Sequence, residues 1–339
     1  MAILVTGGAG YIGSVAVDDL IDAGEEVVVI DNLSRGFREA VNDAAVFYEA
    51  DIGDKEIIEK ICRGHDVTAV MHFSAYGYVG ESVARPDIYY QNNIVQTAGL
   101  LDAIRECGVR QFVFSSTCAT YGEPVQMPMD ESHPQDPANP YGRTKLAVEW
   151  MLDDYDRAFG MKYVALRYFN ACGGTERRCE RHDPETHLIP LLLDAASGKR
   201  EFLSVFGDDY PTPDGTAIRD YIHVSDLSQA HLLALKYLKD GGSSDAFNLG
   251  NGNGFSVLEV IEAAKAVTGI DVPYQVEGRR AGDPSRLIAK ADKAASILGW
   301  KPQHTDLDSI IKSAWNWRRA GSASTGAEIP VSQERGLQL

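Results

Sequence analysis

Near its start the chain reads Ile3-Leu4-Val5-Thr6-Gly7-Gly8-Ala9-Gly10-Tyr11-Ile12-Gly13, an apolar run that enters a glycine-rich loop and then a helical pattern reaching about Ala23. Glycines spaced in this way let the backbone turn tightly, approach a pyrophosphate and pack a helix against the strand. The N-terminus of that helix then faces the phosphates. Because the loop follows a strand, opens a helix and precedes Asp31, this stretch predicts a dinucleotide-binding unit.

Further apolar strands alternate with amphipathic helical stretches in the first half of the chain. The predicted strands are Val27–Ile30, Val46–Tyr48, Ala69–Phe73, Gln111–Phe114 and Tyr163–Leu166. Apolar strands separated by helices are typical of a parallel sheet that is covered on both faces. We therefore predict an α/β fold with a doubly wound, Rossmann-type parallel sheet.

The rhythm of the sequence changes after about Cys179, where loops with prolines and shorter elements replace the regular alternation. We predict a NAD-binding Rossmann domain over residues 1–178. A smaller C-terminal α/β domain over residues 179–320 would mainly bind the substrate, with some segments returning to the first domain. Residues 321–339 lack periodic apolar positions and are predicted to form a disordered tail.

Composition and charge exclude several classes of protein. The 339 residues carry 32 basic and 49 acidic side chains, a net charge of −17, and no run of Lys and Arg interrupts it. Long-range attraction to nucleic acid or to an anionic membrane is therefore not expected. The first apolar run is too short for a signal peptide, and none is long enough to cross a bilayer, so we predict a cytoplasmic protein. The cysteines are odd in number, 5, and without a CxxC pair, which argues against a disulfide framework and a structural zinc site.

Asp31 ends the second predicted strand and can accept hydrogen bonds from ribose hydroxyls, while its charge would repel a 2′-phosphate. NAD is therefore the predicted cofactor rather than NADP. Arg35 lies close enough to weaken that preference, although it can equally be a solvated loop arginine. Asp51 and Ile52 follow the third strand and either contact the adenine or form a plain turn.

Tyr141 and Lys145 stand four residues apart in a predicted helix and so share one face. An ammonium beside a phenol favours the ionised phenolate, which makes the tyrosine a usable base. Thr117 ends the fifth strand, so its hydroxyl should emerge at the carboxyl edge of the sheet and reach a sugar oxygen. Ser115 and Ser116 are alternatives by residue type.

A cluster of possible metal ligands occurs in His182-Asp183-Pro184-Glu185-Thr186-His187. Pro184 and the absence of an HExxH spacing favour a loop, and no metal site is predicted.

These motifs resemble the extended short-chain dehydrogenase/reductase family and, within it, the UDP-glucose 4-epimerases, from Met1 to about Trp317. The resemblance extends beyond the cofactor half of the chain. It rests on Val5–Ser14, Asp31-Asn32-Leu33, Gly80-Glu81-Ser82, Asn92-Asn93, Tyr141–Lys145, Leu166–Asn170, His187–Pro190, Phe206–Thr212, Arg219–His223, Asn248–Asn251 and Arg279–Asp283.

The resemblance implies an enzyme, an isomerase that interconverts UDP-glucose and UDP-galactose through a 4-keto intermediate, with transient hydride transfer to tightly bound NAD. Tyr141 would take the proton of the sugar 4-hydroxyl, Thr117 would hold the same hydroxyl, and Lys145 would lower the tyrosine pKa and bind the nicotinamide ribose. The implied cofactor contacts are Gly7, Gly10, Tyr11, Ile12, Gly13, Asp31, Asn32, Leu33, Ser34, Arg35, Gly36, Asp51, Ile52, Phe73, Ser74, Ala75, Asn92, Thr117, Tyr141, Lys145 and Phe169.

The implied UDP-sugar contacts come mostly from the second half of the chain. They are Thr117, Tyr141, Asn170, His187, Leu188, Ser204, Phe206, Arg219, Arg280 and Asp283. Two arginines suit a diphosphate on physical grounds, although they can also be surface ion pairs, and Asp283 would suit a ribose hydroxyl. The family also implies a homodimer, formed by helices near Asn93–Cys107 and Leu146–Phe159.

The chain departs from the family pattern at Gly77, where a cofactor-contacting lysine is typical. NAD would then bind less tightly, or another cation would substitute. Leu287 has an intermediate size at a position thought to gate N-acetylated hexoses, so acceptance of UDP-N-acetylhexosamines and UDP-pentoses stays open. A dehydratase would carry an Asp-Glu pair after Thr117, where this chain has Cys118 and Ala119. The same fold could also serve a decarboxylase of sugar nucleotides or an inert NAD-sensing regulator.

Overall fold

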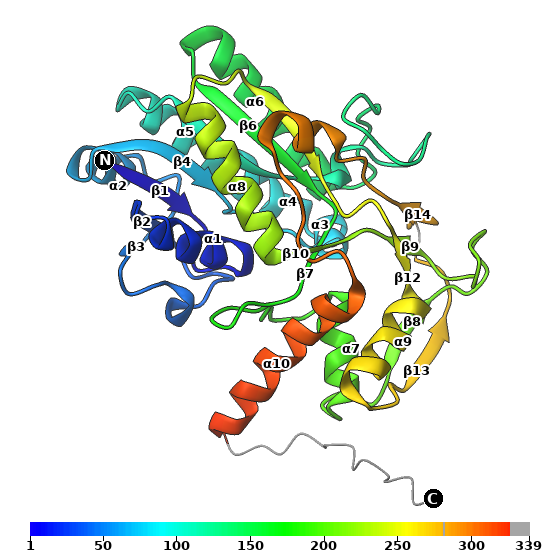
Figure 1. Ribbon diagram of the computed structural model, residues 1–339. Helices are drawn as coiled ribbons and strands as arrows, with labels where there is room; N and C mark the ends of the chain where they lie inside the picture. The colour runs from blue at the N-terminus through cyan, green and yellow to red at the C-terminus, as the bar shows by residue number, and fades with distance from the viewer. Residues whose placement is uncertain (281, 326–339) are drawn as a thin grey trace, which may run out of the picture.

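The computed structural model describes residues 1–280 and 282–325. A seven-stranded sheet forms the centre of the larger lobe, in the order β11-β6-β5-β4-β1-β2-β3 (Figure 1). All of its pairings are parallel, and the run from β3 to β6 has the strand order of dinucleotide-binding sheets. The predicted doubly wound fold is therefore confirmed. The strands are β1 (Ala2–Thr6), β2 (Glu26–Asp31), β3 (Val46–Glu49), β4 (Val67–His72), β5 (Gln111–Thr117), β6 (Lys162–Tyr168) and β11 (Asp245–Leu249).

Helices cover both faces of this sheet. On one face lie α1 (Tyr11–Asp22) and α8 (Val224–Lys239), whose apolar side chains share a buried core with β1 and β6. On the other lie α2 (Lys55–Gly64), α5 (Gln96–Glu106) and α6 (Pro140–Phe159), which form a second core. Figure 1 shows α1 and α8 together in front of the sheet. Buried faces on both sides explain why the strands read as continuous apolar runs.

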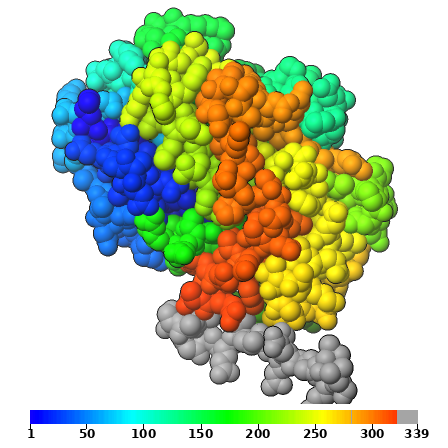
Figure 2. Space-filling model, viewed as in Figure 1, coloured from blue at the N-terminus to red at the C-terminus, as the bar shows by residue number. Residues whose placement is uncertain are grey.

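The smaller lobe has its own core beneath the carboxyl edge of the sheet. It contains α7 (Leu188–Ala196), α9 (Val257–Thr268) and α10 (Leu307–Thr325), whose buried residues pack together, and Figure 2 shows α9 and α10 side by side. Short strands complete it. They are β7 (Asn170–Cys172), β8 (Leu203–Phe206), β9 (Ile218–Arg219), β10 (Tyr221–His223), β12 (Phe255–Ser256), β13 (Tyr274–Glu277) and β14 (Arg286–Leu287).

The chain crosses between the lobes more than once. After β10, α8 and β11 return to the larger lobe and add its outermost strand beside β6. Leu298 and Trp300 also pack into the core formed with α1 and α8. The predicted two-domain division near residue 178 includes segments that return to the first domain, and α8 and β11 are such segments.

The predicted tail begins inside a helix. α10 ends at Thr325, so residues 321–325 are helical rather than disordered, and residues 326–339 lie outside the described part of the chain. The remaining short helices are η1 (Arg38–Ala40), α3 (Val79–Ala84), α4 (Pro86–Tyr89), η2 (Tyr90–Val95), η3 (Cys118–Thr120) and η4 (Ala294–Leu298). None of the described helices combines the length and the apolar character that a membrane crossing requires. The cysteines are all free.

Candidate active site

The glycine-rich loop between β1 and α1 leaves no room for side chains. A Cβ on Gly7 would lie 2.6 Å from the backbone nitrogen of Ser74, and one on Gly13 would lie 2.2 Å from the carbonyl oxygen of Gly7. Gly7 also has a φ of +72°, a conformation that favours glycine. Gly10 is the N-cap of α1, so the amides of the first helical turn lack intrahelical partners. This end of α1 suits a diphosphate.

Asp31, the last residue of β2, lies beside this loop. Its Oδ2 accepts a hydrogen bond from the Ala9 amide at 3.0 Å, and its Oδ1 accepts one from the Leu33 amide at 2.9 Å. Burial raises the pKa of its carboxyl group. The two amide donors fix the carboxylate at the edge of the sheet, where its remaining lone pairs can accept hydrogen bonds from a ribose.

Arg35 is engaged by a neighbouring carboxylate. Its Nη2 donates to Glu81 Oε1 at 2.7 Å, and its guanidinium lies 5.1 Å and 5.0 Å from the ring centres of Tyr76 and Tyr78. A guanidinium held in this way does not offer a free cation for a 2′-phosphate. The geometry around Asp31 and Arg35 therefore favours NAD over NADP.

The other cofactor candidates line the same edge. Asn32 Nδ2 donates to Asp51 Oδ1 at 2.6 Å, which joins the ends of β2 and β3, and Ile52 is buried behind them. Ser34 and Gly36 follow in the β2 loop, where a Cβ on Gly36 would lie 2.8 Å from the Ala9 side chain. The segment Phe73-Ser74-Ala75 continues from β4 past Gly7. The segments that follow β2 and β4 therefore meet the glycine-rich loop, and Asp51 after β3 is joined to them through Asn32.

Asn93, which was not among the predicted site residues, fastens this edge to α6. Its Oδ1 accepts from the Tyr76 amide at 2.8 Å, and its Nδ2 donates to the Tyr76 carbonyl and to Thr144 Oγ1, both at 3.0 Å. The candidate beside it, Asn92, donates from Nδ2 to Asn93 Oδ1 at 3.0 Å. A buried asparagine beside a half-buried one carries no periodic signal, so the sequence alone does not show that Asn93 is the residue that makes these bonds.

The start of α6 sets the position of Tyr141. Asn139 caps the helix by accepting from the Gly142 amide at 2.9 Å, and Pro140 occupies the first helical position. A Cβ on Gly142 would lie 2.3 Å from the Ala119 carbonyl oxygen, so the first turn is pressed against the segment that follows Thr117. This close approach places Tyr141 beside the end of β5.

Tyr141 and Thr117 are neighbours, because the Thr117 hydroxyl is close enough to lower the pKa of the Tyr141 phenol. Burial raises the pKa of the Tyr141 phenol to about 12, and the Thr117 hydroxyl works against that rise. We expected the Lys145 ammonium to lower this pKa below its ordinary value. In the structure the desolvation of the phenol is the larger effect.

Lys145 lies one turn further along α6 and is buried. Its Nζ donates to the Ser115 carbonyl at 2.7 Å and stands 4.9 Å from the ring centre of Phe114. Burial lowers the pKa of the lysine to about 7, which the charge of Glu149 partly offsets. A lysine with this pKa is only partly charged near neutrality.

The three hydroxyl side chains that end β5, Ser115, Ser116 and Thr117, have different partners. Ser115 Oγ accepts a hydrogen bond from the Tyr168 hydroxyl, and Ser116 Oγ donates to Glu149 Oε1 at 2.5 Å. Both serine hydroxyls are therefore hydrogen-bonded to buried side chains of the protein interior. Of the three hydroxyls, Thr117 is the one beside Tyr141, as predicted from its place at the strand end.

Two pairs of predicted substrate residues come together in the smaller lobe. Arg219 on β9 forms an ion pair with Asp283, and the Arg280 guanidinium lies 3.8 Å from the ring centre of Phe206 on β8. Arg219 also lies near Cys118, where its charge lowers a thiol pKa that burial raises to about 12. Arg219 therefore stands on the same side of the sheet as Thr117.

The remaining substrate candidates lie on neighbouring elements. Asn170 Nδ2 donates to the Asp220 carbonyl at 3.1 Å, and Phe169 packs with Leu287. Ser204 lies on β8, and Leu188 is the first residue of α7. His187 caps α7, but its side chain faces Glu180 and Glu185.

Gly77, which stands where the family typically has a lysine, has free space around it. A Cβ on Gly77 would meet no heavy atom within 4 Å. The Arg35 guanidinium lies over the rings of Tyr76 and Tyr78, on either side of Gly77. A cation therefore stands nearby, although Glu81 already pairs with it.

Comparison with known proteins places this geometry in context. The model of the NAD dependent epimerase/dehydratase family matches residues 3–250. A UDP-glucose 4-epimerase of Halalkalibacterium halodurans is 52% identical over 321 residues, covering 94% of this chain and 96% of that protein. A UDP-glucose 4-epimerase of Brucella ovis in complex with NAD is 49% identical with a TM-score of 0.91, covering 93% and 97% of the two chains. One from Stenotrophomonas maltophila, with bound NAD and formylated UDP-arabinopyranose, is 41% identical with a TM-score of 0.92, covering 96% and 99%.

Proposed function

This chain belongs to the NAD dependent epimerase/dehydratase family, and we propose that Thr117, Tyr141 and Lys145 carry out its reaction. The chain is an NAD-dependent isomerase of the extended short-chain dehydrogenase/reductase family that interconverts UDP-glucose and UDP-galactose, in keeping with relatives about half identical over nearly their full length. Its ligands are NAD and a UDP-sugar. The remaining sugar-nucleotide activities and the inert regulator are not favoured.

One observation carries the assignment of residues: at the carboxyl edge the Thr117 hydroxyl lies close enough to the Tyr141 phenol to act on its pKa, with Lys145 one turn further along α6. When bound, NAD supplies a reversible hydride acceptor for carbon 4 of the hexose. Tyr141 takes the proton of the 4-hydroxyl and later returns it, which is general acid–base chemistry. Thr117 holds the same oxygen. Lys145 binds the nicotinamide ribose and supplies positive charge to the phenolate.

The cofactor residues fit NAD on the chemistry of their donors. The amides at the start of α1 face a diphosphate, the Asp31 carboxylate faces ribose hydroxyls, and the loop after β4 closes over Gly7. We propose the full predicted set of cofactor contacts on this basis. Phe169 would lie near the nicotinamide, while Asn92 acts through Asn93.

The smaller lobe, mainly residues 179–320, would bind the UDP part of the substrate. Arg219 and Arg280 offer guanidinium donors to a diphosphate, and Asp283 can exchange its pairing with Arg219 for a ribose hydroxyl. Asn170, His187, Leu188, Ser204 and Phe206 complete the proposed contacts. Substrate affinity would then reside in the nucleotide, which leaves the hexose free to turn between the two hydride transfers.

The test of this function is turnover of UDP-galactose by the purified chain, first without added NAD and then with it. Formation of UDP-glucose without added NAD is the expected result and would mean that NAD is retained despite Gly77. Formation of UDP-glucose only after NAD is added would support the same reaction, but it would mean that the chain binds NAD weakly because of Gly77. No UDP-glucose under either condition would overturn the proposed function.

We further propose a homodimer, in the cytoplasm, built on the helices already named. Apolar side chains on η2 and α6 are exposed: Tyr90 is 42% exposed, Val95 54%, Trp150 63% and Phe159 45%. Exposed apolar side chains on these helices are what a subunit interface would bury. These helices lie on the face of the sheet opposite α1 and α8.

We predict that Trp150→Glu converts the dimer to a monomer, because it places a charge in the apolar contact. Light scattering coupled to size-exclusion chromatography would measure the mass. Val125→Glu is the matched control, since Val125 is 75% exposed but lies in a loop away from these helices. A monomeric wild type, or a Trp150→Glu variant with the dimer mass, would contradict the proposed interface.

A further inference from the structure

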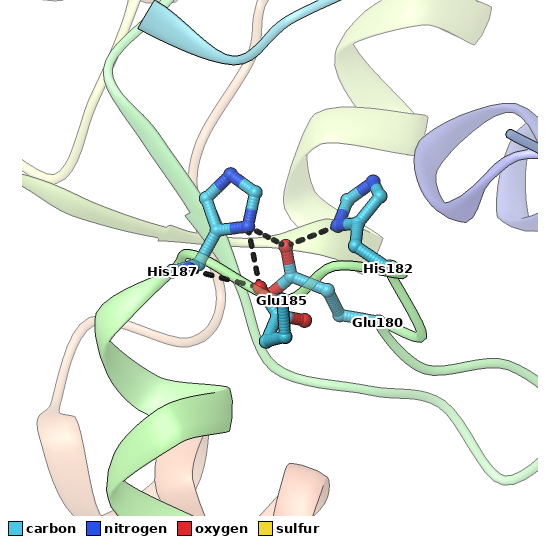
Figure 3. A group of neighbouring side chains, drawn as sticks. All are labelled: Glu180, His182, Glu185 and His187. Carbon is cyan, nitrogen blue, oxygen red and sulfur yellow. Dashed lines mark hydrogen bonds and ion pairs between the residues drawn. The ribbon is translucent and has the colours of Figure 1, made fainter. Parts of the chain in front are cut away.

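Two histidines and two glutamates converge in the loop before α7. They are Glu180, His182, Glu185 and His187, and each offers one ligand atom, all within 4.8 Å of one another. Figure 3 shows both imidazole rings turned so that Nδ1 faces the Glu180 carboxylate. The predicted loop therefore forms, but its fold brings together residues whose spacing did not suggest a metal site.

The contacts within this cluster are short. Glu180 Oε1 lies 3.0 Å from His182 Nδ1 and 2.9 Å from His187 Nδ1, and Glu185 Oε1 lies 2.8 Å from His187 Nδ1. Ligands bound to one ion at about 2.1 Å stand roughly 3.0 to 3.4 Å apart. The four ligand atoms could therefore reach the separations that one metal ion requires through side-chain movements alone.

The charges of the cluster call for a cation. Two carboxylates stand here, and the basic groups that lie against them are the imidazoles of His182 and His187. Buried carboxylates are normally paired or bound to metal, and Glu180 is only 6% exposed. One divalent ion with two carboxylates and two neutral imidazoles sums to zero charge.

Protonated histidines are the alternative source of that charge. Burial opposes it, yet Glu180 and then Glu185 raise the pKa of His187 to about 10. Burial likewise works against ionisation of Glu180, whose pKa His187 and His182 nevertheless lower to about 2. Protons on the two imidazoles are therefore the alternative to a metal ion at this cluster.

Aromatic side chains flank the cluster on one side, while the His187 side chain stays 41% exposed. The Tyr78 ring lies 5.6 Å from the ring of His182 and 6.1 Å from that of His187, and Tyr11 lies 6.4 Å from His182. The cluster therefore lies between the start of α1, which carries Tyr11, and the start of α7, where an ion from solvent can reach it.

We propose that Glu180, His182, Glu185 and His187 bind one zinc ion that cross-links this loop. Mixed imidazole and carboxylate ligands suit zinc, whereas magnesium and calcium prefer all-oxygen sites. Coordination through Nδ1 leaves each Nε2–H free, so His187 can still donate to a substrate. The ion fixes the N-terminus of α7, and the site does not depend on the proposed function.

The test measures zinc in the full chain by mass spectrometry of the metal, after dialysis against zinc sulfate and removal of unbound ion. About one zinc per chain is expected for the wild type. His182→Gln and Glu185→Gln should each lose most of it. His304→Gln is the matched control, because His304 stacks on His223 at 4.1 Å between ring centres, away from this loop, and it should retain the wild-type content.

Thermal unfolding of the same proteins gives a second readout. Zinc should raise the Tm of the wild type and of His304→Gln but leave the Tm of His182→Gln unchanged. Equal Tm values for all three without zinc would exclude misfolding as the cause. A wild type that retains no more zinc than His182→Gln, or a His304→Gln variant that also loses it, would overturn the site and leave protons as the balancing charge.

Discussion

Tyr141→Phe is expected to lower kcat for UDP-galactose by roughly a hundredfold to ten-thousandfold, because phenylalanine has no proton to exchange. The ring of phenylalanine fills the same space, so packing at the start of α6 should survive. Thr117 loses the neighbouring phenol hydroxyl but can still hold the sugar hydroxyl. Steady-state rates with saturating UDP-galactose would measure the effect.

Tyr155→Phe is the matched control for that experiment. Tyr155 lies on the same helix, and its hydroxyl donates to Asp102 Oδ1 at 2.8 Å on the surface. Removing this hydroxyl should leave kcat unchanged, and both variants should retain as much NAD as the wild type. A Tyr141→Phe variant with kcat within a few-fold of the wild type would eliminate Tyr141 as the base.

The pH dependence of the wild type adds an independent check. Burial raises the pKa of the Tyr141 phenol to about 12, so only a small fraction is ionised near neutrality. The reactive phenolate becomes more abundant as pH rises, and kcat should rise with it. The Tyr141→Phe variant should lose this dependence.

The parts of the fold predicted from sequence are those that local patterns specify. Apolar runs predicted the strands β1 to β6. The spacing of the glycines predicted a tight loop, and the structure shows the reason in the close approach of Gly13 to the Gly7 carbonyl. Tyr141 and Lys145 lie together because helical spacing alone joins them. These predictions needed no long-range contact.

The parts that sequence reasoning missed depend on contacts distant in the chain. β11 is a short run, Asp245–Leu249, and its pairing with β6 depends on the return of the chain through α8. The Asn93 clamp becomes visible only when Tyr76 and Thr144 are brought beside it. His182 and His187 meet because a loop folds back, which no regular spacing encodes.

The pKa values of the reacting pair show a different limit. Helical spacing correctly placed Lys145 on the face of Tyr141, but it carried no information about burial. Desolvation raises one pKa and lowers the other, so the two groups are further from their charged forms than proximity suggests. Tyr141 and Lys145 lie close to a network of buried polar side chains.

That network centres on a buried ion pair. Arg167 Nε donates to Glu149 Oε1 at 3.0 Å and its Nη2 donates to Oε2 at 2.5 Å, with both side chains only 7% exposed. Ser116 donates to the same carboxylate, and Arg167 Nη1 donates to the Tyr121 hydroxyl at 3.0 Å. The pair therefore joins β5, β6 and α6 directly beneath Thr117 and Lys145.

Arg167→Leu is expected to lower the free energy of unfolding by about 3–5 kcal/mol, because it removes the guanidinium paired with the buried Glu149 carboxylate and leaves only the partly charged Lys145 nearby. Chemical denaturation would measure the loss. Arg157→Leu is the matched control: Arg157 pairs with Asp153 at 2.6 Å, but the side chains are 73% and 43% exposed. Breaking an exposed pair should cost less than about 1 kcal/mol.

The double variant Arg167→Leu/Glu149→Gln separates the cost of the buried charge from the loss of packing. A glutamine keeps an oxygen that can accept from Ser116, but it removes the negative charge that lost its partner. If the unpaired charge is the cause, the double variant should be more stable than Arg167→Leu alone. If both variants are equally unstable, the arginine stabilises this region through its packing and its bond to Tyr121, and the ion pair itself contributes little.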